Sequence, residues 1–73
     1  SDDDPSFSRR LAQRRLGELL RRTHLSIQER RVITLSTLDY LPLAQVAKRV
    51  GLTQRATTLC RFEALYKLRQ AAE

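Results

Sequence analysis

The segment Gly51-Leu52-Thr53 constrains the fold most, because it separates two stretches whose apolar residues recur at helical spacing. Glycine readily adopts the left-handed conformation that ends many helices, and threonine is a favoured N-terminal cap. Pro42 suits the first position of a short helix over 43–50. After the segment, the pattern predicts a second helix from Gln54 to about Ala71. Two helices are therefore expected to meet at a tight three-residue turn.

Small and apolar residues beside this turn indicate that the two helices pack closely. The buried face of the first helix is expected to hold Leu43, Val46, Ala47 and Val50. Ala47 lies where that helix would cross the next one, and Leu52 would fill the space between them. Such a pair of helices forms a helix-turn-helix, which we place at residues 43–69. A helical hairpin that has alanine and glycine at this spacing by chance is the alternative.

An acidic, polar segment over residues 1–6 opens the chain and is interpreted as a flexible lead-in. Ser6 or Ser8 is the expected cap of a first helix that runs to about Thr23. Within this stretch, apolar residues follow helical spacing. They are Leu11, Ala12, Leu16, Leu19 and Leu20.

A second helix is expected to start at Ser26. Ser26 and Glu29 have the spacing of a capping box, in which each residue satisfies a backbone N–H of the other. This helix should end near Leu38, because Pro42 follows and residues before proline avoid the helical conformation. The sequence therefore predicts an all-α fold, a four-helix bundle-like single domain over 7–73 that contains the helix-turn-helix.

The composition favours helices and excludes several classes of protein. Aromatic residues make up only 5% of the chain, whereas strands draw on aromatic and β-branched side chains. A chain of 73 residues builds one small core, which leaves no room for a deep catalytic cleft, so we expect no enzyme. No apolar stretch approaches the ~18 residues of a membrane span. The lone Cys60 forms no internal disulfide, which fits a cytoplasmic protein.

No residues combine into a catalytic or metal site in the sequence. His24 has no second histidine or cysteine nearby, and is expected to lie against the C-terminal end of the first helix, where a cation is favoured. Cys60 is expected to be a small core residue. Glu18, Glu29 and Glu63 lie on different predicted helices and form no carboxylate pair. We therefore expect no cofactor, no small-molecule ligand and no membrane partner.

The net charge of +6 indicates a polyanionic partner. Beyond the acidic lead-in, arginines follow one another with few acidic residues between them. They are Arg9, Arg10, Arg14, Arg15, Arg21, Arg22, Arg30 and Arg31. For those of the first helix, a solvated helix face is the alternative explanation.

Residues 25–69 resemble region 4 of the σ70-type RNA polymerase sigma factors. The resemblance runs without gaps through GLTQRATTLCRFEALYKLR and includes LSIQERRVITL and PLAQVAKRVGLT upstream. Together with the arginine-rich first helix, it covers about residues 9 to 70. The DNA-binding domains of LuxR-type regulators share much of this pattern and are the nearest competitor.

The resemblance implies a transcription domain that binds a promoter element in double-stranded DNA and contacts the RNA polymerase core. In such motifs, the N-terminal residues of the second helix, here 54–69, reach base edges in the major groove. The residues expected to read bases are Gln54, Arg55, Thr58 and Leu59. The residues expected to contact phosphates are Lys48, Arg49, Thr53 and Arg61.

A protein-interaction module on the same scaffold is the alternative function. The family usually has charged or amide residues at the positions of Thr58 and Leu59, and an exposed apolar residue there suits a protein better than DNA. Such a module would bind RNA polymerase or another regulator through the first helix and a few further residues. These are Leu59, Phe62, Arg30 and Arg31. A LuxR-type domain, in turn, would act as a dimer.

Overall fold

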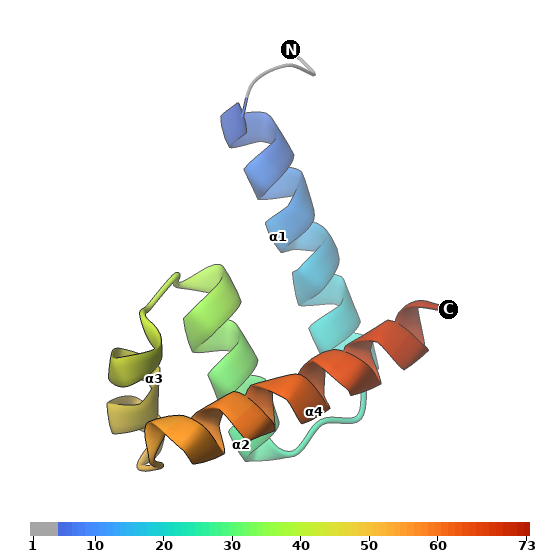
Figure 1. Ribbon diagram of the computed structural model, residues 1–73. Helices are drawn as coiled ribbons and strands as arrows, with labels where there is room; N and C mark the ends of the chain where they lie inside the picture. The colour runs from blue at the N-terminus through green and yellow to red at the C-terminus, as the bar shows by residue number, and fades with distance from the viewer. Residues whose placement is uncertain (1–4) are drawn as a thin grey trace.

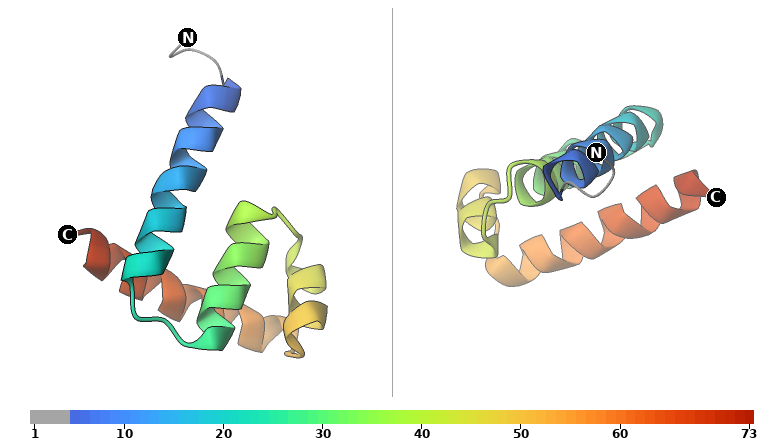
Figure 2. Two further views of the ribbon diagram at one scale, coloured as in Figure 1. Left: turned by 180° about the vertical axis from the view of Figure 1, so that it is seen from behind. Right: turned by 90° about the horizontal axis from the view of Figure 1, so that it is seen from above.

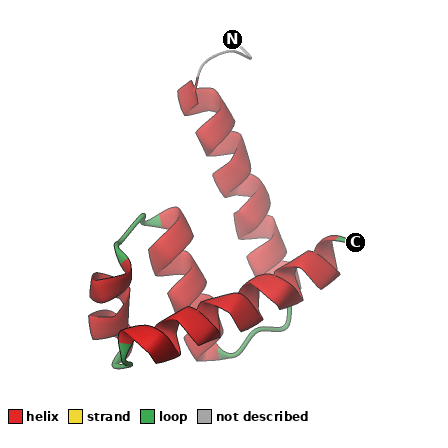
Figure 3. Ribbon diagram, in the orientation of Figure 1, coloured by secondary structure: helices red, strands yellow, loops and turns green. Residues whose placement is uncertain are grey.

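The computed structural model describes residues 5–73, which form an all-α domain. Four α-helices are present in this part: α1 (Pro5–Arg22), α2 (Ile27–Ile33), α3 (Leu43–Val50) and α4 (Gln54–Ala72). A π-helical segment, η1 (Thr34–Leu38), continues α2, and no strand occurs among the described residues (Figure 3). Helix α4 runs along the base of the domain, and α1 and α2 rise from it (Figures 1 and 2). The predicted all-α fold with four helices is confirmed.

Helix α1 starts earlier than the sequence predicts. It begins at Pro5, so Ser6 and Ser8 lie inside the helix and the prediction that either one caps it is wrong. Proline suits a first helical position because its φ is already helical and its missing N–H has no partner there in any case. The predicted lead-in over 1–6 therefore overlaps α1 at its end, and its first four residues lie outside the described part.

The capping box at the start of α2 forms as predicted. The Ser26 hydroxyl accepts the Glu29 N–H at 3.1 Å, and the Glu29 Oε1 accepts the Ser26 N–H at 2.8 Å. The same Oε1 accepts a hydrogen bond from Lys67 Nζ at 2.9 Å, which links α2 to α4. The backbone N–H of Ser26, followed by Lys67, holds the pKa of the buried Glu29 carboxyl below its ordinary value of 4.5.

The helix that follows the capping box reaches Leu38, as predicted, but its last part is π-helical. The Asp39 N–H donates to the Thr34 carbonyl at 3.1 Å, one residue further back than in an α-helix. The Ser36 hydroxyl donates to the Val32 carbonyl at 2.7 Å, and the Thr37 hydroxyl donates to the Ile33 carbonyl. Because these hydroxyls occupy backbone acceptors, they perturb the regular hydrogen-bond ladder.

The connection from η1 to α3 turns at Tyr40, which has a φ of +57°. This left-handed conformation is uncommon for residues other than glycine. The Arg9 guanidinium lies 5.5 Å from the centre of the Tyr40 ring, and Gln13 Nε2 donates to the Leu38 carbonyl at 3.2 Å, so α1 contacts this connection. Pro42 has an extended backbone and precedes the first helical residue of α3, so its predicted position was one residue too far into the helix.

The core consists of two clusters that meet at α2 and α4. The first cluster joins α1, α2 and α4, and its buried members are Leu20, Leu25, Ile33, Ala64 and Leu68. The second cluster joins α2 and α3, and half-buried Cys60 of α4 packs against it. Its buried members are Val32, Val46 and Val50.

Arg30 supplies a cation at the C-terminal end of α1, where the sequence analysis expected His24 to lie. The Arg30 guanidinium donates to the carbonyls of Leu20 and Thr23, the latter at 3.1 Å, whereas His24 is exposed. The long arginine side chain reaches back from α2 across the connection. It satisfies carbonyls that have no partner inside the helix.

We expect Glu29→Gln to lower the free energy of unfolding by about 1–3 kcal/mol at neutral pH, because the change removes charge-assisted hydrogen bonds from a buried site. Urea denaturation measures this loss. The exposed Glu63 provides the control variant, Glu63→Gln, for which little change is expected.

The stabilisation that Glu29 provides should also depend on pH. Because folding lowers the pKa of Glu29, its contribution is complete above the unfolded value of 4.5 and is lost as the pH falls through the lower folded value. The difference in stability between the unchanged chain and Glu29→Gln should therefore shrink in acid. If this difference in stability stayed constant down to the lowest pH at which both chains still fold, the role of the ionised carboxylate would be contradicted.

Candidate nucleic-acid interface

Three residues, 51–53, join α3 to α4 and have the conformations that the sequence predicts. Gly51 has a φ of +74°, in the left-handed region, and its N–H donates to the Ala47 carbonyl. The Leu52 N–H donates to the same carbonyl at 3.0 Å. The Thr53 hydroxyl accepts the Ala56 N–H at 3.1 Å and caps α4. These bonds fix the direction in which α4 leaves the turn.

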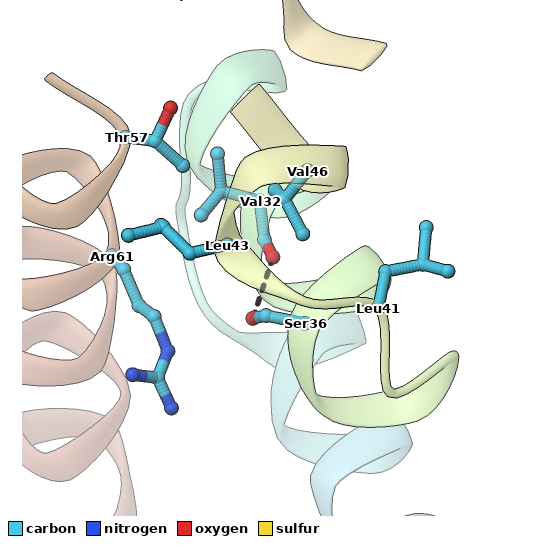
Figure 4. Close-up of a pocket in the computed structure, with 7 residues that line it drawn as sticks. All are labelled: Val32, Ser36, Leu41, Leu43, Val46, Thr57 and Arg61. Carbon is cyan, nitrogen blue, oxygen red and sulfur yellow. Dashed lines mark hydrogen bonds between the residues drawn. The ribbon is translucent and has the colours of Figure 1, made fainter. Parts of the chain in front are cut away.

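The packing beneath this turn follows the prediction except at its start. Val46, Ala47 and Val50 are buried, and half-buried Leu52 packs against the second core cluster. Leu43 is 39% exposed, so its predicted place on the buried face is wrong. Leu43 is the first residue of α3, and its side chain lines a cavity on the side that faces Thr57 and Arg61 of α4 (Figure 4).

The four residues predicted to read bases lie in the first two turns of α4. Gln54, Arg55 and Leu59 are exposed. Thr58 is half-buried, and its hydroxyl donates to the Gln54 carbonyl at 3.0 Å. No acidic side chain within residues 5–73 pairs with Arg55. Three of the four side chains are thus exposed to solvent, and the guanidinium of Arg55 has no ion pair among the described residues.

Basic side chains gather at the corner where α3 ends. Gln28 and Arg31, one turn apart on α2, donate to the carbonyls of Val50 at 3.4 Å and of Arg49 at 3.0 Å. Arg49 and Arg31 line a shallow hollow together with Arg30, and Lys48 is exposed beside them. We name Arg31, Lys48 and Arg49 the basic corner. It immediately precedes the turn into α4, so positive charge borders the first turn of that helix.

Arg61 and Arg30, two residues of the predicted sites, have neighbours that the sequence did not predict. Arg61 lines a cavity of about 200 Å³ between η1, α3 and α4 with Val32 and Leu43 (Figure 4). Six residues after Arg55, Arg61 is rotated by about 120° from it, but it follows Gln54 by seven residues and therefore lies within about 20° of Gln54 on the same side of α4. The guanidinium of Arg30 is occupied by carbonyls of α1 and its connection.

A row of exposed apolar residues continues along α4 beyond the reading residues. Leu59, Phe62 and Tyr66 are 58%, 62% and 63% exposed. The sequence interpretation included Leu59 and Phe62 but missed Tyr66. Its spacing of seven residues from Leu59 was the available signal, because two residues at that spacing lie on nearly the same face of a helix.

Neither a reactive thiol nor a metal centre is evident in the part of the chain that the structure describes. Cys60 packs against the second core cluster, and burial raises the pKa of its thiol, so the thiol stays protonated at neutral pH. No three His, Cys, Asp or Glu side chains among residues 5–73 gather where they could hold a metal ion. No helix within this range has both the length and the apolar character needed to cross a membrane.

Comparisons of the chain with protein-family models, curated proteins and solved structures found no match. A function for this chain is therefore inferred from the contacts and charges of its own residues.

We expect the two glycines to respond to alanine in opposite directions. Gly51→Ala should destabilise the fold by about 1 kcal/mol, because a Cβ is strained at its positive φ although it meets no atom within 4 Å. Gly17→Ala, inside α1 and equally open, should stabilise the fold by up to about 1 kcal/mol. Thermal unfolding of both variants measures the effects. Stabilisation by Gly51→Ala would contradict the left-handed turn.

Proposed function

We propose that the chain is a DNA-binding domain of a cytoplasmic transcription factor, similar to sigma region 4, which recognises a promoter element through α4. The observation that supports this most is the basic corner next to the first turn of α4. Gln54 and Arg55 are exposed there, and Arg31 donates a hydrogen bond to the carbonyl of Arg49 just before the turn. A polar reading face bordered by unpaired positive charge suits duplex DNA.

In this proposal α3, the turn and α4 act as a helix-turn-helix, and the N-terminal end of α4 enters the major groove. Arg55 pairs with the O6 and N7 atoms of guanine, and Gln54 pairs with adenine. Leu59 offers an apolar contact to a thymine methyl group. Thr58 contributes its methyl group, or accepts a hydrogen bond, because its hydroxyl proton is donated to Gln54.

The basic corner has a different role from the reading residues. Lys48 and Arg49 neutralise phosphates of the DNA backbone, which sets affinity and register without reading sequence. Arg31 retains donors beyond the one given to Arg49 and contributes to the same surface. Thr53 supports this arrangement indirectly, since its hydroxyl caps α4 and fixes the start of the reading helix.

The further proposal that the domain contacts the RNA polymerase core rests on the resemblance of residues 25–69 to sigma region 4. The LuxR-type alternative shares the reading helix and differs in acting as a dimer. Sedimentation of the chain with a bound duplex distinguishes one chain per site from two.

Selection of bound sequences from a random duplex pool at two salt concentrations tests the proposal. We expect one enriched motif, and we expect Arg55→Ala to weaken binding to it by about 1–3 kcal/mol, or about 5- to 150-fold. Arg69→Ala, at an exposed arginine about 21 Å further along α4, is the matched control and should leave discrimination between sequences unchanged. Absence of duplex binding at low salt would refute the proposed function.

The basic corner makes a separate, sequence-independent prediction. Lys48→Gln or Arg49→Gln should weaken binding to all duplexes alike, and should each reduce the slope of log affinity against log salt by about one. Titrations at several salt concentrations measure this slope. A loss confined to one DNA sequence would instead assign these residues to base recognition.

A further inference from the structure

The solvent-facing side of α4 has an apolar surface that the proposed base contacts leave largely unused. Leu59, Phe62 and Tyr66 follow one another at intervals of three and four residues, so they lie on one face of the helix. More than half of each side chain is exposed. Single exposed apolar residues are ordinary, but a contiguous group of them marks an interaction surface. We name these three residues the α4 stripe.

An arginine stands at each end of the α4 stripe. Arg55, Phe62 and Arg69 are spaced seven residues apart and therefore form one row along the helix. The two arginines are separated by about 21 Å along the axis, at 1.5 Å per residue. Both are exposed, and within residues 5–73 neither pairs with an acidic side chain. Glu63 is rotated by about 100° from Phe62 and by about 40° from Leu59, so it borders the stripe on the side away from the arginine row.

This charge pattern disfavours a second copy of the chain as the partner. If two α4 stripes paired in antiparallel fashion, Arg55 of each copy would face Arg69 of the other. If they paired in parallel, each arginine would face its own equivalent. Either pairing places like charges opposite one another between two chains of net charge +6, which is unfavourable.

We propose that the α4 stripe binds an acidic amphipathic helix of a protein partner. The apolar side of such a helix covers Leu59, Phe62 and Tyr66, and carboxylates about 21 Å apart pair with Arg55 and Arg69. An apolar stripe between two cations suits this partner better than nucleic acid, because phosphates offer nothing to cover the two aromatic rings. Helix-in-groove recognition uses the same spacing of apolar anchors on the partner.

This surface overlaps the proposed reading face at Arg55 and Leu59. The acidic helix and duplex DNA therefore exclude one another, and the partner acts as an antagonist of DNA binding. This consequence rests on the proposed function, whereas binding of the acidic helix itself does not.

A displayed library of random 20-residue helical peptides, selected on the immobilised full chain, tests the proposal. We expect enrichment of peptides with an apolar centre and acidic residues near both ends. Phe62→Ser combined with Tyr66→Ser should weaken binding of an enriched peptide by about 30-fold or more, as for interface anchors. Arg69→Gln should weaken binding of the peptide without affecting binding of the duplex. Ile27→Ser, at a residue 81% exposed on α2, is the control and should change peptide affinity less than about twofold.

Several results would overturn the proposal. One is equal binding of the enriched peptides to the Phe62→Ser/Tyr66→Ser variant, and another is a consensus without acidic residues. If the chain forms a dimer and the same double variant abolishes it, the α4 stripe instead binds a second copy of the chain. Loss of duplex binding in Arg69→Gln or in the double variant would assign it to DNA. Competition by an enriched peptide against a selected duplex tests mutual exclusion separately, so failure of DNA binding leaves the peptide result intact.

Discussion

At the start of α2, one oxygen of a buried carboxylate accepts hydrogen bonds from two parts of the molecule. Oε1 of Glu29 closes the capping box with the Ser26 N–H and binds the ammonium group of Lys67 on α4. The first contact determines where α2 begins, and the second holds α4 against it. Because α4 supplies buried residues to the first cluster and Cys60 beside the second, its position decides whether either cluster can close. The other carboxylate oxygen is buried without a hydrogen-bond partner among the described residues, so this link also has an energetic cost.

From that link, a chain of contacts leads to the candidate site. Gln28 and Arg31 on α2 bind the last carbonyls of α3, and the turn that follows sets the direction of α4. The exposed first turn of α4 and the basic corner are thus held at a fixed separation by backbone acceptors. This rigidity fits the proposed function, since base contacts tolerate little displacement of the reading side chains.

Local signals in the sequence predicted the local structure well. Ser26 with Glu29, Gly51 and Thr53 each act through bonds to residues within four positions, and all of them form as expected. The sequence did not reveal features that depend on distant segments. The long side chain of Arg30 reaches across the connection to carbonyls at the end of α1, and Lys67 meets Glu29 over 38 positions. The candidate site divides in the same way: the exposure of Gln54 and Arg55 follows from helix periodicity, whereas the place of Arg61 beside a cavity depends on where η1 lies. The roles in DNA binding stay predictions.

The two core clusters give the domain a modular construction. Helix α1 packs only into the first cluster and α3 only into the second, and the two clusters share α2. Substitutions in α1 that preserve Leu16, Leu19 and Leu20 therefore leave the second cluster intact. In the projecting half of α1, Arg9 and Gln13 contact the connection from η1 to α3, so evolution can change the other exposed positions of that half independently of the unit formed by α2, α3 and α4. The reverse does not hold, because a change in α4 reaches both clusters at once.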